Sequence, residues 1–293
     1  MNHTGTFSRR EVLRMAATGL GAAVMMDIHT PALPAKTPPP VKGRLKQSVA
    51  RWCMEKIPFE ELARAVAEMG LKGIDLVDAP EEWAILKKYG LVCSMVRAET
   101  KIPDGFNRKE NHEQLEKLYK EWIPRAAAAG WPNIIAFSGN RRGLPDPEGL
   151  ENCVIGLNRV KTIAEEHNVT ICFEILNSKV NHKDYQFDHM PWGVEVIKRV
   201  NSPRVKILYD IYHAQIMDGD IIRTIRDNIR HIAHFHTGGV PGRHELDDTQ
   251  ELNWRSVATA IADLGYGGYF AHEFVPTREP LASLKEAVTL CDV

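Results

Sequence analysis

The sequence predicts an α/β fold in which eight parallel strands close into a barrel, and two observations support this prediction. After Lys46, short apolar runs alternate with amphipathic segments as far as the C-terminus. This alternation gives eight strand–helix units, and strict alternation of this kind is typical of a parallel sheet with helices on its outside. We therefore expect a single (β/α)8 TIM barrel domain over residues 47–293.

The period of the apolar residues, which differs between strands and helices, gives the expected elements. Strands are expected at residues 47–54, 73–78, 91–98, 133–139, 168–176, 204–209, 229–236 and 268–274. Helices are expected at residues 58–69, 79–89, 108–129, 147–167, 190–200, 220–228, 253–264 and 280–290. A doubly wound open sheet is the alternative, but such a sheet usually has fewer strands, and no G-x-G-x-x-G motif follows the first strand.

The composition is that of an ordinary globular protein, with 44% hydrophobic and 26% charged residues. The formal net charge of -1 gives no general attraction to nucleic acid or to acidic membranes. The 5 cysteines are scattered singly without a C-x-x-C pair, so neither a zinc knuckle nor a disulfide framework is expected. We expect most of these thiols to be buried as small hydrophobic side chains.

The first 40 residues differ in character from the remainder. Paired arginines, Arg9 and Arg10, precede a modest apolar run at residues 15–26, and this arrangement resembles a twin-arginine export signal. The resemblance implies a signal at residues 1–35, a proline-rich linker at residues 36–46, and export to the periplasm by the twin-arginine machinery. The apolar run is too short to span a bilayer of about 30 Å, so no stable membrane span is expected. A basic amphipathic tail is the alternative.

Four polar side chains are expected to face the interior of the barrel near the ends of strands. Successive side chains on a strand point to opposite faces, so the apolar residues that meet the helices determine which neighbours face inward. On this basis the inward set comprises Glu174, Asp210, His236 and Glu273. Active sites of such barrels lie at the carboxyl ends of the strands, where these residues are placed. His234 lies one layer deeper, and we expect a structural or supporting role for it.

Three carboxylates that converge in a pocket of low dielectric constant would repel one another unless a cation lies among them. With one imidazole added, the set suits a divalent ion such as Mn²⁺, Mg²⁺ or Co²⁺, and Zn²⁺ is a further candidate. For any single carboxylate, an ion pair with Lys206 or Arg230 is the alternative.

Five short motifs carry a resemblance to a known family. Their order in the chain is Phe173-Glu-Ile-Leu-Asn177, Tyr209-Asp-Ile-Tyr-His-Ala-Gln215, Gly219-Asp220, Val240-Pro-Gly-Arg-His-Glu245 and Leu264-Gly-Tyr-Gly-Gly-Tyr269. Together they resemble the hydroxypyruvate isomerase group of the xylose isomerase-like (AP endonuclease 2 type) barrels, over about residues 48–280. This resemblance implies a divalent metal ion and an isomerase that interconverts aldoses and ketoses.

The resemblance also implies roles for individual residues. Glu174 and Glu273 would bind the metal and act as the acid/base pair, and Asp210 would be a further ligand. His213 and Arg243 would contact the substrate. One position departs from the pattern of the hydroxypyruvate isomerases. These enzymes typically have a glutamine where this chain has His236, whereas ketose epimerases have a histidine there.

The function predicted from these residues is isomerisation or epimerisation of a small hydroxy-carbonyl compound or sugar. A metal stabilises an enediolate, and two glutamates on opposite faces of the substrate remove and return the proton. Trp52 and Asn177 are further candidates for substrate contacts, Trp52 as a wall of the site on the first strand. Whether the chain forms a homo-oligomer is left open.

Three other functions remain as alternatives on the same frame. One is a lyase that dehydrates a cyclic polyol or a dehydroshikimate-like acid. Another is a non-catalytic exported barrel that binds carbohydrate. The third, phosphodiester hydrolysis of the endonuclease type, needs several metal ions and a DNA-binding surface, which the near-neutral charge does not favour.

Overall fold

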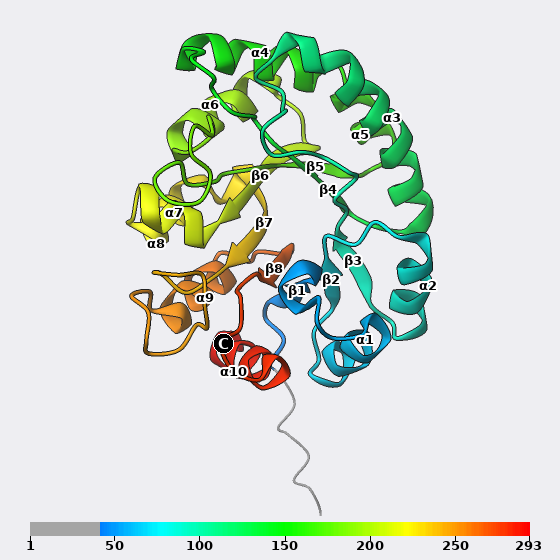
Figure 1. The fold of residues 1–293 in the computed structure, drawn as a ribbon, viewed down its shortest axis with the longest axis vertical. Coiled ribbons are helices and arrows are strands. Elements are labelled where there is room, and N and C mark those ends of the chain that lie inside the picture. The colour runs from blue at the N-terminus through cyan, green and yellow to red at the C-terminus, as the bar shows by residue number, and fades with distance from the viewer. Residues whose placement is uncertain (1–41) are drawn as a thin grey trace, which may run out of the picture. The chain divides into compact units, whose positions relative to one another are not determined.

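The computed structural model describes residues 42–293, in which eight parallel strands form one sheet in the order β3-β2-β1-β8-β7-β6-β5-β4. A parallel bridge between Val96 and Ile134 joins the two outer strands of this order. Val96 N donates to Asn133 O at 2.9 Å, and Ile135 N donates to Val96 O at 3.0 Å, so the sheet closes on itself. Figure 1 shows the strands around the centre and the helices outside them. The predicted TIM barrel is confirmed.

All eight expected strands are present, and all except β6 are shorter than predicted. Their bounds are β1 Lys46–Ala50, β2 Gly73–Asp75, β3 Val92–Met95, β4 Asn133–Ala136, β5 Thr170–Glu174, β6 Val205–Asp210, β7 Ile232–Thr237 and β8 Tyr269–His272. The register pairs His236 with Asp210 on one side and with Ala271 on the other. The carboxyl ends of β6, β7 and β8 therefore lie level, which brings their terminal side chains to the same height in the barrel.

Every predicted helix has a counterpart among the described residues. The α-helices are α1 Phe59–Glu68, α2 Pro80–Lys88, α3 His112–Ala129, α4 Asp146–Asn158, α5 Lys161–Glu166, α6 Met190–Val200, α7 Ile211–Met217, α8 Ile221–Asn228, α9 Trp254–Asp263 and α10 Pro280–Cys291. The short 3₁₀ helices are η2 Arg51–Met54, η3 Lys109–Asn111 and η4 Ile229–His231.

Three details of the prediction were wrong. The helix expected at residues 147–167 is interrupted, because Val160 has φ −118° and ψ −9°, away from helical values, and its side chain is buried. A helix that was not expected, α7, begins directly after β6, because Asp210 Oδ1 accepts a hydrogen bond from His213 N at 3.1 Å and caps it. Trp52 lies in η2 and not on the first strand.

Aromatic side chains on neighbouring strands fill the space between the sheet and the helices. Phe173, Tyr209, Phe235 and Phe270 have no solvent exposure. Phe173 stacks on Trp192 of α6, and Phe270 meets Trp254 of α9 edge to face. These contacts place the apolar positions of the strands toward the helices, so their alternating neighbours face the barrel interior. Four of the five cysteines are buried and the fifth, Cys53, is half-buried, as expected.

The chain joins the barrel earlier than expected. Lys42 N and Gly43 N donate to the two carboxylate oxygens of Asp292 at 2.8 and 3.1 Å, and Leu45 is buried. Residues 42–46, predicted as the end of a linker, therefore belong to the folded barrel. The predicted export signal at residues 1–35 lies outside the described residues. From residue 42 onward, no helix combines the length and apolar character needed to cross a membrane.

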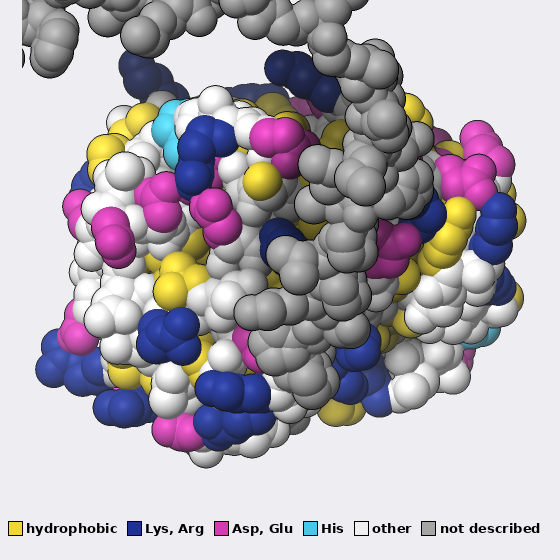
Figure 2. All heavy atoms as spheres, turned by 90° about the horizontal axis from the view of Figure 1, so that it is seen from below, with side chains coloured by type: hydrophobic (Ala, Val, Ile, Leu, Met, Phe, Trp, Pro, Cys, Tyr) yellow, Lys and Arg dark blue, Asp and Glu magenta, His cyan; other side chains and the backbone are white. Residues whose placement is uncertain are grey.

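The surface carries charges of both signs. Figure 2 shows a face on which lysine and arginine side chains are interspersed with aspartate and glutamate, with hydrophobic side chains scattered between them. Several of the charges pair along α3, as Lys117 does with Glu113 at 2.9 Å and Lys120 with Glu116 at 2.7 Å. Exposed pairs of this kind contribute only about 0.3–0.5 kcal/mol each, so the stability of the fold depends on the interior.

Closure of the barrel extends into the loops that follow β3 and β4. Phe106 N donates to Phe137 O at 3.1 Å, and Asn107 N donates to Ser138 O at 2.8 Å. At Gly105 an added Cβ would lie 2.2 Å from Phe137 O and 2.4 Å from Gly139 N. Only a glycine allows the two loops to approach this closely.

We therefore expect Gly105→Ala to lower the free energy of unfolding by about 2 kcal/mol or more, because backbone atoms of the neighbouring loop must move. Gly267→Ala is the matched control, since no atom of the described part of the chain lies within 4 Å of its added Cβ. It should change stability by about 0.5 kcal/mol or less. Urea denaturation followed by circular dichroism measures both, and equal stabilities of the two variants would contradict the close approach.

Candidate metal centre

Four side chains converge at the carboxyl ends of β5 to β8. His236 Nδ1 lies 2.6 Å from Glu273 Oε2, 3.1 Å from Glu174 Oε1 and 3.9 Å from Asp210 Oδ2. One ligand atom from each of the four residues lies within 4.8 Å of the others. The predicted convergence of these side chains is confirmed, while their role as metal ligands stays a prediction.

The donor set fits a divalent ion. Glu174 is the last residue of β5, Asp210 the last of β6, and Glu273 directly follows β8, so each carboxylate comes from a separate strand. All four side chains are buried. Three carboxylate oxygens with one imidazole nitrogen suit hard to borderline ions such as Mg²⁺, Mn²⁺, Co²⁺ or Zn²⁺.

Arg243 lies against two of these carboxylates. Its Nη2 donates to Asp210 Oδ2 at 2.8 Å and also contacts Glu273 Oε2, while its Nε donates to Glu273 O at 3.1 Å. The guanidinium carbon lies 5.4 Å from the ring centre of Trp52 and 5.1 Å from that of Tyr212. Arg243 thus supplies positive charge to the cluster itself, where the resemblance implied only a contact with the substrate.

Burial and neighbouring charges have opposing effects on the pKa values of the cluster side chains. Burial raises the pKa of Asp210 and of Glu174. Burial would also raise the pKa of Glu273, but attraction to Arg243 and His236 lowers it overall. Burial disfavours a charged imidazole, yet the surrounding carboxylates outweigh it and raise the pKa of His236 well above its usual value. A divalent ion at Nδ1 would take the place of a proton there.

A cavity of about 840 Å³ opens above the cluster. Its wall is mainly apolar, with charged and polar side chains at a few points, and includes Trp52, Leu76, Ile102, Phe137, Leu176, Lys101 and His182. Glu174 and Glu273 also form part of the wall. Asp210 and His236 have no solvent exposure and lie deeper. Two of the four cluster residues can therefore touch a molecule in the cavity.

Trp52 forms one side of the cavity, while its role as a wall for substrate stays a prediction. Its side chain is 40% exposed, which is unusual for a large aromatic residue in this chain. The indole Nε1 donates to Glu273 Oε1 at 2.5 Å, so the ring is fixed relative to the cluster. An exposed aromatic face that is held in one orientation offers a surface on which the carbon skeleton of a sugar can pack.

His213 and Asn177, two predicted substrate contacts, are fully buried and lie outside the described cavity wall. His213 Nδ1 is 3.1 Å from Asn177 N, and His213 Nε2 is 2.9 Å from Arg243 Nη1. Asn177 Oδ1 accepts from Val180 N and Asn181 N, both at 2.9 Å. These two residues hold Arg243 and the loop after β5 in place. This geometry does not favour direct contact of either residue with substrate.

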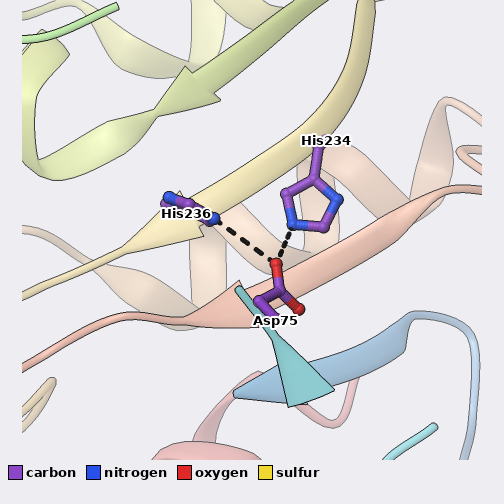
Figure 3. A group of neighbouring side chains, drawn as sticks. All are labelled: Asp75, His234 and His236. Atoms are coloured by element: carbon purple, nitrogen blue, oxygen red, sulfur yellow. Dashed lines mark hydrogen bonds and ion pairs between the residues drawn. The ribbon is translucent and has the colours of Figure 1, made fainter. Parts of the chain in front are cut away.

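Asp75 on β2 is a buried member of the site that the sequence interpretation missed. His234 Nε2 donates to Asp75 Oδ2 at 2.5 Å, and His236 Nε2 lies 3.4 Å from the same oxygen, as Figure 3 shows. Asp75 alternates with Ile74 and Leu76, so the argument applied to the later strands would have placed it inward. His234 occupies the deeper layer expected of it.

The fold and the site together define a class of protein, an α/β barrel with a carboxylate–histidine cluster at the carboxyl ends of its strands. The sequence profile of the family described as "Xylose isomerase-like TIM barrel" matches residues 63–291. The chain belongs to this family.

Named relatives are similar over different shares of their length. A 2-oxo-tetronate isomerase of Pectobacterium atrosepticum is 31% identical over 222 residues, 75% of this chain and 78% of that protein. A protein of Danio rerio named "Putative hydroxypyruvate isomerase" is 30% identical over 150 residues, 47% of this chain and 54% of its own. A D-psicose 3-epimerase of Ruminiclostridium cellulolyticum is 29% identical over 161 residues, 53% of this chain and 50% of that protein. The last two alignments span about half of the relative's length.

Among solved structures, the crystal structure of an AP endonuclease, family 2, from Brucella melitensis is similar with a TM-score of 0.73 and 25% sequence identity. The similarity covers 82% of this chain and 97% of that one. The two chains therefore share the barrel fold over most of their length.

Glu245 fastens the loop that carries Arg243. Its carboxylate accepts hydrogen bonds from Thr277 N at 2.8 Å, Thr277 Oγ1 at 2.9 Å, Ser283 Oγ at 2.9 Å and Arg278 N at 3.2 Å. Burial would raise the pKa of Glu245, but hydrogen bonds from its own backbone N–H, from Thr277 and from Ser283 lower it to about 2. The loop after β7 is thus tied to the loop after β8.

Glu245→Gln should lower the free energy of unfolding at pH 7 by about 1–3 kcal/mol, because charge-assisted hydrogen bonds are lost. The pKa of this carboxyl is about 2 in the folded state. An unfolded glutamate has a pKa of about 4.3, so the stabilisation is complete above about pH 5 and decreases as the pH falls toward 2.

Urea denaturation at pH 7 and pH 3 measures how much the free energy of unfolding of Glu245→Gln falls below that of the wild type. This deficit should be smaller at pH 3. Glu286→Gln is the control, because within residues 42–293 this exposed carboxylate pairs with Arg278 alone, at 3.0 Å. It should cost about 0.5 kcal/mol or less at both pH values. The assignment fails if the deficit of Glu245→Gln is independent of pH.

Proposed function

We propose that the protein is a divalent-metal-dependent isomerase or epimerase of a small hydroxy-carbonyl compound. The observation that carries the proposal is the convergence of three carboxylates and one imidazole beneath a cavity, with Glu174 and Glu273 in the cavity wall. The names of the relatives, which include hydroxypyruvate isomerase, 2-oxo-tetronate isomerase and D-psicose 3-epimerase, support the reaction class.

Four residues would hold the ion, namely Glu174, Asp210, His236 and Glu273. A bound Mn²⁺, Mg²⁺ or Co²⁺ would stabilise the negative charge that develops on the oxygens of an α-hydroxy carbonyl compound when its C–H bond is broken. Zn²⁺ remains a further candidate for the same donor set.

The two glutamates that reach the cavity carry the proton transfer. Glu174 comes from β5 and Glu273 from the end of β8, so the two carboxylates approach the cavity from different strands. One carboxylate takes the proton from carbon, and the other returns a proton to the enediolate at the neighbouring carbon or on the opposite face. The proton balance closes without any redox partner, which is the requirement for an isomerase or epimerase.

Other residues of the wall orient the substrate and exclude water. Trp52 is held by its hydrogen bond to Glu273, and Leu76, Ile102 and Phe137 complete an apolar surface. The cavity volume of about 840 Å³ falls within the range of about 300–1,000 Å³ that is typical of small-molecule sites. It accommodates a monosaccharide as readily as a three-carbon or four-carbon acid.

Proton exchange and metal content test the proposal together. The protein is stripped of metal and reloaded with Mn²⁺, and we expect about one equivalent per chain by mass spectrometry, as for a single octahedral site. Incubation in D₂O with hydroxypyruvate, a 2-oxo-tetronate or D-psicose should place deuterium on carbon, observed by NMR. Metal removal should abolish the exchange, and Mn²⁺ should restore it.

Glu174→Gln and Glu273→Gln should each lower kcat by about 10²–10⁴-fold, the usual contribution of a general acid or base. Glu251→Gln, an exposed carboxylate outside the cavity wall, is the control and should leave the rate unchanged. A Glu273→Gln variant that binds metal and turns over at the wild-type rate would refute the proton-transfer role. Loss of water from the substrate would point to a lyase, and binding of sugar without exchange to a carbohydrate-binding protein.

We also propose that the chain is exported to the periplasm by the twin-arginine route, supported by the paired Arg9 and Arg10 before an apolar run. Replacement of both by lysine should shift the protein from the periplasmic to the cytoplasmic fraction, measured by immunoblotting of fractionated cells. Arg14→Lys, in the same basic segment, is the control and should leave export intact. Periplasmic accumulation of the double variant would contradict this route.

A further inference from the structure

A second buried cluster lies beneath the candidate metal centre and shares one residue with it. Figure 3 shows the imidazoles of His234 and His236, both on β7, directed toward the carboxylate of Asp75 on β2. Two strands, β1 and β8, separate β2 from β7 in the sheet, so this contact crosses the interior of the barrel. All three side chains have no solvent exposure.

The carboxylate of Asp75 is held from both neighbouring strands. Its Oδ1 accepts a hydrogen bond from Ser48 Oγ of β1 at 2.7 Å and another from Ser94 Oγ of β3. At Gly73 an added Cβ would lie 2.9 Å from Ser94 Oγ, so the glycine leaves room for this hydroxyl. With Oδ1 bonded to two hydroxyls, Oδ2 is directed to the histidines of β7.

The two nitrogens of His236 face different partners. Nδ1 lies among the carboxylates of the candidate metal centre, 2.6 Å from Glu273 Oε2. Nε2 has no hydrogen bond of ordinary geometry among residues 42–293, and the acceptor it faces is Asp75 Oδ2 at 3.4 Å. A neutral imidazole has one proton, so Nδ1 can bind a metal ion only if the ring proton is on Nε2.

We propose that Asp75 is a positioning residue that acts through His236. Its carboxylate keeps the ring proton on Nε2, which leaves the lone pair of Nδ1 directed into the metal centre. This role of Asp75 rests on the proposed function, in which a divalent ion binds at the candidate metal centre. His234, which donates to the same oxygen, fixes the carboxylate on the side of β7.

A second ion bound by Asp75, His234 and His236 is the competing interpretation, because these residues lie close enough to share one. Its surroundings are less suited to an ion. It has one carboxylate, and neither Asp75 nor His234 lies in the described cavity wall, whereas the candidate metal centre has three carboxylates and two residues in that wall. The stoichiometry of metal binding separates the two interpretations.

Mn²⁺ affinity of the metal-free protein, measured by isothermal titration calorimetry, tests the role of Asp75 without reference to activity. Asp75→Asn keeps the size of the side chain and removes its charge, and it should weaken Mn²⁺ binding by about 10–100-fold. Ser48→Ala is the matched control, because it removes a hydrogen bond to Oδ1 and leaves Oδ2 facing His236. It should change the affinity by less than about threefold. Circular dichroism establishes that each variant is folded.

The wild-type protein provides a second measurement that does not depend on the variant folding. In ¹⁵N-histidine-labelled protein loaded with Mg²⁺, long-range ¹H–¹⁵N spectra should show His236 with its proton on Nε2. A proton on Nδ1 would overturn the proposal, as would equal Mn²⁺ affinities of a folded Asp75→Asn variant and the wild type. Two equivalents of Mn²⁺ in the wild type, with one lost in Asp75→Asn, would make Asp75 a direct ligand and equally overturn it. A wild-type protein that binds no Mn²⁺ would instead refute the proposed function itself.

Discussion

Negative charge buried at the ends of the strands is the constraint on which the site and its surroundings depend. Glu174, Asp210 and Glu273 meet where solvent does not reach Asp210 at all. Two unit charges 4 Å apart interact by about 4 kcal/mol at an effective dielectric constant of 20, so such a cluster must be neutralised to be compatible with folding. The guanidinium of Arg243 and the imidazole of His236 supply the compensating charge from the protein itself.

The local structure around the cluster follows from this requirement. Arg243 adopts a positive φ of 59° in a short loop, a conformation that a non-glycine residue rarely adopts without compensation. Glu245 binds the same loop to the segment after β8, and His213 meets the guanidinium from α7. Asp210, the last residue of β6, caps α7 with one carboxylate oxygen and pairs with the guanidinium of Arg243 through the other. One side chain therefore links the strand, the helix and the charged loop residue.

The sequence predicted what depends on the alternation of side chains and missed what depends on contacts between distant segments. The period of two in a strand determines the direction in which each side chain points. This alternation located Glu174, Asp210, His236 and Glu273. Asp75 escaped notice because its partners, His234 and His236, lie across the barrel, so nothing near it in the sequence marks it as part of the site. Helix α7 was missed because seven residues show little periodicity, and its start depends on a cap from the preceding strand. No local pattern could show that His213 faces Arg243 and not the cavity.

The histidine at position 236 and the aspartate at position 75 are best understood as a pair. A glutamine, which the resemblance makes typical of hydroxypyruvate isomerases at this position, can offer its oxygen to an ion without any specific proton arrangement. An imidazole has a nitrogen on each side of a rigid ring, so binding through one nitrogen requires an acceptor for the proton on the other. Asp75, fixed by serines of β1 and β3, lies where that acceptor is needed. Under the proposed function, the residue at position 236 is thus linked to the polar interior of β1 to β3, across the barrel from β7.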